Sequence, residues 1–261
     1  MIELYSINPD EQLMLVRDSH WQRDIVRGSL DINVAKYLQL FQPDWLVSEG
    51  LVSETASGRG MVYFFEAMDE KCVLRHYFRG GMVARLTDDS FVFTGMQKTR
   101  PYRELSMLCK LFNAGLNVPK PLAAKIQRKG LSYSADIITG AIEESQELHQ
   151  LLMQTSLDKP IWLEIGKTVK LLHNAQVCHT DLNVKNLLLQ ANMNSKELDK
   201  IGMTKVFILD FDGCKERKGE NWKIENLARF RRSLDKQCNK QDQYFFSEEN
   251  WHWFTQGYQS A

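Results

Sequence analysis

The chain has 261 residues, enough for one large domain or for two small lobes. Hydrophobic residues make up 43% and charged residues 25% of it, a composition typical of globular proteins and not of disordered ones. Lys and Arg together number 33, as do Asp and Glu, and this balance argues against a dedicated nucleic-acid-binding protein, which usually has a basic excess.

Targeting signals and paired cysteines are not indicated by the sequence. The first residues show no basic segment followed by an apolar run, and no stretch approaches the ~18 uninterrupted apolar residues of a membrane span. The cysteines are odd in number and widely spaced, which predicts neither a disulfide framework nor a zinc site. We therefore expect a cytoplasmic protein whose cysteines are small core residues.

The first half of the chain is predicted to be rich in strands. Residues 1–50 give no clear pattern and are treated as an N-terminal extension packed on the domain that follows. Residues 61–67 and 71–78 are strand-like runs separated by a short turn, which predicts a hairpin. A helix is expected over residues 101–113, where apolar side chains recur at helical spacing, and residues 131–142 are typical of another strand.

The second half is predicted to be mainly helical. A long helix begins at Asp158 and Pro160, a cap and a first-turn residue, and has one apolar face. Two short strand-like runs follow, at 187–190 and 205–211. This order of elements indicates an α+β fold with two lobes, a strand-rich N-lobe and a mainly helical C-lobe. The expected boundaries are residues 51–142 for the N-lobe and 143–261 for the C-lobe.

Polar residues interrupt apolar chain in HTDLNVKN, residues 179–186, and in FILDFDGC, residues 207–214. A hairpin that joins the neighbouring runs would bring Asn186 near Asp210. One carboxylate and one amide oxygen, together with phosphates and waters, satisfy Mg²⁺, and Asp181 beside them could accept a hydroxyl proton. Helix caps and turns are the alternative for either motif alone, whereas both motifs in this order favour catalysis.

These two motifs resemble those of protein-kinase-like phosphotransferases. HTDLNVKN is similar to their H-x-D-x-x-x-x-N catalytic loop, and LDFD is similar to their metal-binding D-F-G. The resemblance implies a kinase fold with a shortened activation segment, Asp181 as catalytic base, and Asn186 and Asp210 as Mg²⁺ ligands. Thr180 replaces the family's Arg, Asp212 replaces its Gly, and no A-P-E segment follows. These departures favour a small-molecule or lipid kinase over a protein kinase.

Residues that would bind the nucleotide are expected upstream. Gly58 and Gly60 lie at a strand-like turn, where glycines let backbone amides approach phosphates, although such a pair is also common in simple turns. By the same resemblance, Val73 would cover the adenine and Arg75 would be the phosphate-binding cation. The family usually has Lys in place of this Arg, so Lys71 is a competing candidate, and a solvated strand charge is the alternative for both.

Glu104 lies on the helix expected over residues 101–113. Protein-kinase-like enzymes use a helix glutamate to hold the phosphate-binding cation, and the resemblance implies that Glu104 holds Arg75 in this way. An exposed surface glutamate is the alternative.

A narrower resemblance covers most of the chain, from about residue 57 to residue 235. The stretches GRGMVYFF, VLRHYFRGGMVARLTDDSFVFTG and TRPYRELSMLCKLFNAGLNVPKPLAAKI, together with the two motifs above, are similar to the 3-deoxy-D-manno-octulosonic acid (Kdo) kinase family. This resemblance implies ATP- and Mg²⁺-dependent phosphorylation of the 4-hydroxyl of Kdo on a lipid A precursor in lipopolysaccharide core biosynthesis. It also implies peripheral binding to the anionic cytoplasmic face of the inner membrane, with no obligate protein partner.

Cationic side chains near such an acceptor would assist binding. One candidate group is Arg75, His76, Arg79 and Arg85. The other, which we interpret as ordinary solvated surface, is Lys215, Arg217, Lys218, Lys223, Arg229, Arg231 and Arg232. The aromatic C-terminal segment, residues 245–259, is expected to pack on the C-lobe. His179 is expected to be structural, and no role beyond packing is expected for His173.

Two other functions are compatible with the motifs. A kinase for another hydroxylated acceptor, such as the core heptose or an aminoglycoside, would share the same catalytic residues. A nucleotide-binding pseudokinase scaffold is suggested by Arg75 and Asp212, whereas the intact Asp181, Asn186 and Asp210 argue against it.

Overall fold

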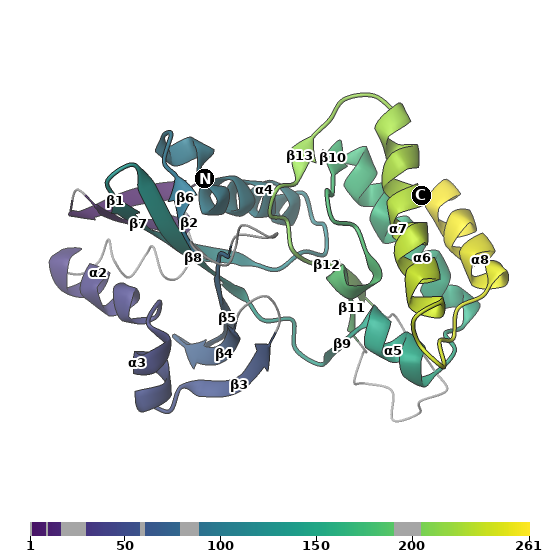
Figure 1. The fold of residues 1–261 in the computed structure, drawn as a ribbon, viewed down its shortest axis with the longest axis horizontal. Helices are drawn as coiled ribbons and strands as arrows, with labels where there is room; N and C mark the ends of the chain where they lie inside the picture. Colours follow the sequence, from purple (N-terminus) through teal and green to yellow (C-terminus); the bar gives the residue numbers. More distant parts are fainter. Residues whose placement is uncertain (1, 9, 17–29, 58–60, 79–88, 191–204) are drawn as a thin grey trace. The chain divides into compact units, whose positions relative to one another are not determined.

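The structure, a computed structural model, describes residues 2–8, 10–16, 30–57, 61–78, 89–190 and 205–261. The contacts that the chain makes divide it into two units (Figure 1). Unit 1 consists of residues 1–109 and 120–141, and unit 2 of residues 110–119 and 142–261.

Strands dominate unit 1. The described strands form one antiparallel sheet in the order β1-β2-β7-β8-β5-β4-β3, with β6 paired to β8. Their bounds are Ile2–Asn8 (β1), Glu11–Val16 (β2), Val52–Ser57 (β3), Met61–Ala67 (β4), Glu70–His76 (β5), Phe91–Val92 (β6), Pro121–Lys129 (β7) and Ser132–Gly140 (β8). The predicted hairpin is β4–β5, in which Val62 pairs with Arg75. Its turn residues Met68 and Asp69 both have positive φ, as a two-residue hairpin turn requires.

Helices pack against both faces of this sheet. Helix α2 (Leu30–Gln39) and helix α3 (Pro43–Ser48) contribute Tyr37 and Leu46 to a core that also contains Leu13 of β2, Phe65 of β4 and Leu74 of β5. The short 3₁₀ helix η2 (Met96–Lys98) precedes α4 (Arg100–Asn113), the helix predicted at residues 101–113. The burial of these apolar side chains drives the packing.

Unit 2 is mainly helical. Its helices are α5 (Leu148–Gln154), α6 (Lys159–Asn174), α7 (Asn221–Cys238) and α8 (Glu248–Gln259). Two small sheets accompany them, one in the order β12-β11-β9 and one that pairs β10 with β13. Their strands are β9 (Ser145–Glu147), β10 (Val177–Cys178), β11 (Leu187–Gln190), β12 (Lys205–Ile208) and β13 (Lys215–Glu216).

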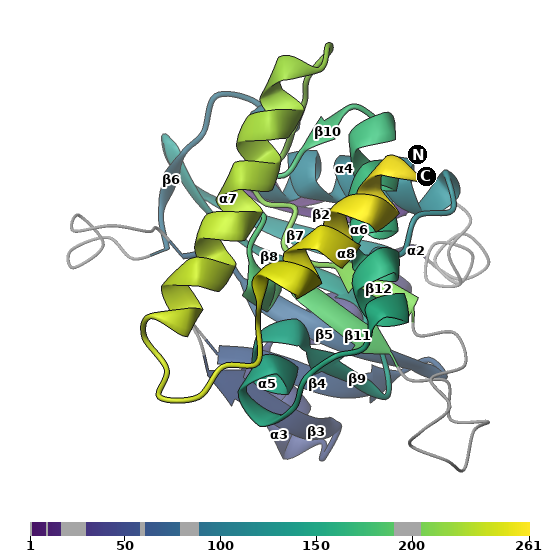
Figure 2. The same cartoon turned by 90° about the vertical axis from the view of Figure 1, so that its right-hand side faces the viewer.

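Helix α8 lies against α6 (Figure 2) at two glycines. A Cβ atom at Gly166 of α6 would stand 2.0 Å from the backbone oxygen of Phe254, and a Cβ at Gly257 of α8 would stand 2.0 Å from that of Leu163. The backbones of the two helices therefore touch, and Phe254 is buried. The aromatic C-terminal segment packs on unit 2, as expected.

None of the described helices combines the length and the apolar character that crossing a membrane requires.

Candidate active site

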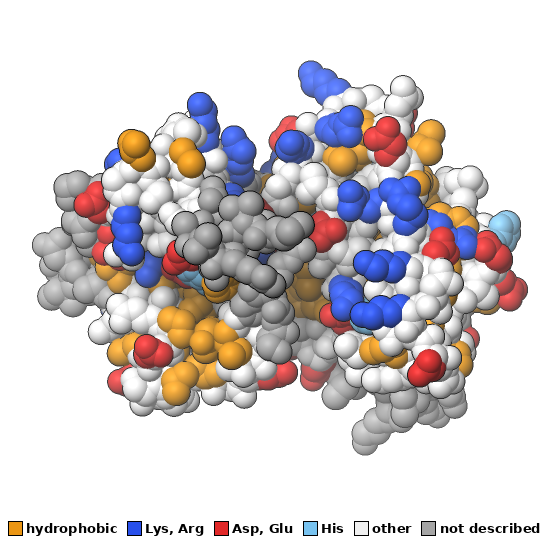
Figure 3. Space-filling view, viewed as in Figure 1, with side chains coloured by type: hydrophobic (Ala, Val, Ile, Leu, Met, Phe, Trp, Pro, Cys, Tyr) orange, Lys and Arg blue, Asp and Glu red, His pale blue; other side chains and the backbone are white. Residues whose placement is uncertain are grey.

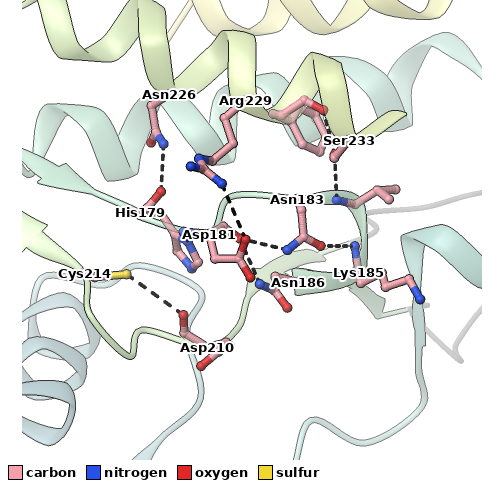
Figure 4. A network of polar contacts seen from close by, with 12 residues as sticks. His179, Asp181, Asn183, Lys185, Asn186, Asp210, Cys214, Asn226, Arg229 and Ser233 are labelled. Carbon is pink, nitrogen blue, oxygen red and sulfur yellow. Dashed lines mark hydrogen bonds and ion pairs between the residues drawn. The ribbon is translucent and has the colours of Figure 1, made fainter. Parts of the chain in front are cut away.

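The loop that follows β10 and the end of β12 lie together in unit 2 (Figure 4). The pairing of β11 with β12 joins Leu187 to Ile208, and the amide of Leu209 donates to the carbonyl oxygen of Asn186 at 2.9 Å. The hairpin pairing predicted for these two runs is therefore present. It places Asn186 beside the residue that precedes Asp210.

Three polar side chains surround one region at this place (Figure 4). Asp181 is exposed, and the Asn186 Nδ2 donates to the Asp181 carbonyl oxygen at 2.9 Å, which leaves the Asn186 Oδ1 as the acceptor of that amide. Asp210 has φ +60°, a left-handed conformation that Asp adopts more readily than most residues and that redirects the chain after β12. A carboxylate and an amide oxygen of this kind fit the oxygen preference of Mg²⁺.

His179 ties the loop to β12. Its ring is fully buried, with Nε2 2.8 Å from the carbonyl oxygen of Leu209 and Nδ1 3.3 Å from the amide nitrogen of Asp181. Burial lowers the pKa of His179, so the ring is neutral at pH 7. Since a carbonyl can only accept, the proton is on Nε2, and Nδ1 accepts from the amide of Asp181. This agrees with the structural role expected for His179.

Helix α7 holds the same loop through three polar residues on one face. The buried Asn226 donates from Nδ2 to the carbonyl oxygen of His179 at 2.7 Å. The Ser233 Oγ accepts from the amide of Val184 at 3.1 Å, and the Arg229 Nη1 lies 3.7 Å from the Asp181 Oδ1. Asn226 and Ser233 were not predicted as site residues. The available signal was their spacing of seven residues, which places them on one face of a helix.

His173 of α6 extends this network, so the expectation that it only packs is wrong. The Tyr258 hydroxyl lies 2.8 Å from its Nδ1, and its Nε2 lies 3.0 Å from the Asn226 Oδ1. Because Asn226 gives its Nδ2 protons to His179, its Oδ1 accepts from His173. Burial lowers the pKa of His173 to about 4, and the neutral ring is the form that this network needs.

In unit 1, Arg75 of β5 pairs with Glu104 of α4. The Arg75 Nη2 is 2.5 Å from the Glu104 Oε1, and the Tyr77 hydroxyl donates to the Glu104 Oε2 at 2.5 Å. Glu104 is 3% exposed, so the alternative of a surface glutamate is wrong. Lys71 is the second residue of the same strand and is exposed, and Val73 is half-buried between them. Gly58 and Gly60 lie outside the described residues.

Several members of the two cationic groups expected from the sequence are bound to acidic side chains. Arg75 is paired as above, and the His76 Nδ1 is 2.6 Å from the Asp136 Oδ1, a hydrogen bond that raises the pKa of His76. Arg79 and Arg85 lie outside the described residues. In the second group, Lys223 is buried and pairs with Glu220, and Arg231 pairs with Asp235 and Glu248. The exposed members that remain are Lys215, Arg217, Lys218, Arg229 and Arg232.

Comparison with known proteins shows the family to which the chain is similar. The model of the lipopolysaccharide kinase (Kdo/WaaP) family matches residues 43–258. The 3-deoxy-D-manno-octulosonic acid kinase of Haemophilus influenzae is 39% identical over 225 residues, which are 84% of this chain and 90% of that protein. The same enzyme of Photobacterium profundum is 40% identical over 84% of this chain and 88% of its own length.

Two solved structures are similar in fold. WaaP, in complex with acyl carrier protein, has a TM-score of 0.55 at 13% identity, with 86% of each chain covered. The Rio2 kinase of Chaetomium thermophilum, in a complex with ADP and Mg²⁺, has a TM-score of 0.50 at 14% identity, with 87% of this chain and 76% of that chain covered. At these identities the likeness shows the fold alone. The predicted α+β, protein-kinase-like fold is confirmed.

Proposed function

This chain belongs to the lipopolysaccharide kinase (Kdo/WaaP) family, and we propose that it transfers the γ-phosphate of ATP to the 4-hydroxyl of Kdo on a lipid A precursor. The relatives that are named Kdo kinases support this choice of acceptor, since the chain covers most of their length. The reaction belongs to lipopolysaccharide core biosynthesis.

The residues of unit 2 supply the acceptor side of the reaction. Asp181 accepts the proton of the 4-hydroxyl while the oxygen forms its bond to the γ-phosphorus, and the bond to the bridging oxygen of ADP breaks. His179 and Asn226 fix the backbone on which Asp181 stands, so the base is oriented before the substrate binds. Asn186 and Asp210 would hold Mg²⁺, which when bound neutralises charge on the phosphates.

The residues of unit 1 supply the nucleotide side. Arg75 binds the phosphates, and the buried Glu104 holds its guanidinium in place. Val73 contacts the adenine in this proposal, and Gly58 and Gly60, outside the described residues, are assigned to phosphate binding. In this role Arg75 replaces the Lys that protein-kinase-like enzymes commonly use. Lys71 is the competing candidate for the phosphate-binding cation, and a test must distinguish the two.

The acceptor is anionic and amphipathic, so we propose that the protein works peripherally at the anionic cytoplasmic face of the inner membrane. ATP and Mg²⁺ are the only cofactors that the mechanism needs. Neither nucleic acid nor an obligate protein partner enters the proposal.

The observation that supports the proposal is that the β11–β12 pairing brings Asn186 next to Leu209, which precedes Asp210, while the Asn186 side chain donates to the carbonyl oxygen of Asp181. The test is phosphate transfer from labelled ATP to a Kdo-bearing lipid A precursor. We expect Asp181→Asn and Asp210→Ala each to lower kcat by about 10²- to 10⁴-fold, with the circular dichroism spectrum unchanged. Asp242→Asn, an exposed aspartate elsewhere in unit 2, is the matched control. Retained turnover in both site variants would refute the assignment.

A panel of acceptors tests the substrate in the same assay. Transfer to a heptose or an aminoglycoside in preference to Kdo would show that the proposed acceptor is wrong and that the proposed kinase activity is right. Nucleotide binding without transfer to any acceptor would instead indicate a pseudokinase.

A further inference from the structure

Arg229 lies beside the proposed catalytic base Asp181 without forming a close hydrogen bond to it (Figure 4). The Arg229 Nη1 is 3.7 Å from the Asp181 Oδ1, and the two side chains are 49% and 52% exposed. A charge-assisted hydrogen bond would be about 2.7–2.9 Å long. The guanidinium therefore keeps its donors available to a further oxygen atom while it remains next to Asp181.

The neighbouring cations of α7 behave differently from Arg229. Lys223 and Arg231 are bound to carboxylates of unit 2, and both have structural roles. Arg232 and Lys236 are exposed and follow Arg229 at helical spacing. Figure 3 shows Lys and Arg side chains gathered on the face of unit 2 over which α7 runs. This positive field favours an anionic ligand at the Arg229 end of the row.

We propose that Arg229 binds the carboxylate of the acceptor sugar and thereby selects a carboxylate-bearing sugar over a neutral one. The proposal rests on the function proposed above. In Kdo the carboxylate is attached to C2, and a single ring carbon separates C2 from C4. A 4-hydroxyl bound to Asp181 therefore brings the carboxylate of the same ring within reach of a guanidinium 3.7 Å from that base. The planar fork of Arg matches a carboxylate with two hydrogen bonds.

The acceptor, and not the nucleotide, is the ligand assigned to Arg229. Helix α7 anchors the loop of Asp181 through Asn226 and Ser233, on either side of Arg229 along the helix. These two contacts hold the helix position of residue 229 beside the loop of Asp181. A heptose has a hydroxyl that can bind Asp181 but no carboxylate that can bind Arg229. It therefore lacks one of the two contacts proposed for Kdo.

Binding measurements test the proposal without relying on turnover. The ligands are the methyl glycoside of Kdo and its C1 carboxamide, each titrated into the full chain with Mg²⁺ and a non-hydrolysable ATP analogue. We expect the wild-type protein to bind the acid about 10- to 100-fold more tightly than the amide. Arg229→Gln should bind both equally, and Arg229→Lys should keep part of the preference. Lys167→Gln, an exposed lysine of α6, is the matched charge control.

The outcomes separate this proposal from the proposed function. If Arg229→Gln keeps the full preference for the acid, or if the wild-type protein has none, the carboxylate site is wrong. If the preference depends on Arg229 but no Kdo acceptor is phosphorylated, the site stands and the proposed reaction fails. If Arg229 only orients Asp181, Arg229→Gln lowers kcat equally for acid and amide with KM unchanged, and this overturns the proposal. The supporting result is a rise in KM for the acid alone, with KM for ATP unchanged.

Discussion

Acid should destabilise unit 2 through His173. This ring is fully buried, and its two nitrogens are engaged by Tyr258 and Asn226. The unfolded chain takes up a proton at this position near pH 6.5, whereas the folded chain does so only near pH 4. Between these values the unfolded state binds more protons, so stability is present above pH 6.5 and is lost as the pH falls toward 4.

The magnitude follows from the difference between the two pKa values. A shift from 6.5 to about 4 corresponds to about 3 kcal/mol over the whole window, at about 1.4 kcal/mol for each pKa unit. Between pH 7 and pH 5 the contribution of His173 to the free energy of unfolding falls by about 2 kcal/mol. Other groups also titrate in this range. Their contribution is the same in a variant that lacks His173, so the difference between the two proteins isolates the effect of His173.

The assay is urea unfolding of the wild-type protein and of His173→Gln at pH 7 and pH 5, followed by tryptophan fluorescence. At pH 7 the variant should be less stable by about 1–3 kcal/mol, because hydrogen bonds to buried groups are lost. At pH 5 this difference should shrink by about 2 kcal/mol. His252→Gln, at an exposed position of α8, controls for replacement of a histidine. An equal difference at both pH values would refute the reasoning.

Three further changes test other contacts. Gly166→Ala should destabilise the protein by about 1–3 kcal/mol in urea although Ala favours helices, because its Cβ would overlap the backbone of Phe254; a gain in stability would contradict the close approach of α6 and α8. Glu104→Gln should raise KM for ATP about tenfold by releasing Arg75, with KM for the acceptor unchanged, and an unchanged KM for ATP would remove Arg75 from the nucleotide site. Ser233→Ala should speed amide hydrogen exchange in the loop that it holds, and unchanged exchange would show that α7 does not restrain this loop.

The sequence predicted the elements whose signals are local. The apolar periodicity of α6 and the alternation in β4 and β5 reflect burial of one face against a core, and these elements appear where they were expected. The pairing of β11 with β12 was also predictable, since Asn186 directly precedes one short apolar run and Asp210 directly follows the other. In each case a contiguous stretch contains the whole signal.

Features that depend on distant partners were not predictable in this way. Strand β2 is stabilised by its pairing with β7 and in turn pairs with β1, and nothing in residues 1–50 alone reveals β7 as the partner. His173 occupies an apolar helix face and is indistinguishable there from a packing residue until Asn226 arrives from α7, 53 residues later. Asn226 in turn has a role only because α7 lies along the loop of His179.

The choice between Arg75 and Lys71 as the phosphate-binding cation depends on both a local sequence pattern and a contact with a distant helix. Both side chains lie on the same face of β5 because they are four residues apart, so alternation along the strand cannot separate them. In the structure, Glu104 of α4 contacts Arg75 with one carboxylate oxygen and Tyr77 with the other. Tyr77 is two residues beyond Arg75 on that face, so Glu104 lies over the C-terminal half of β5 and away from Lys71. A buried acid at this position fits a cation at residue 75 and supports the proposal that Arg75, and not Lys71, binds the phosphates.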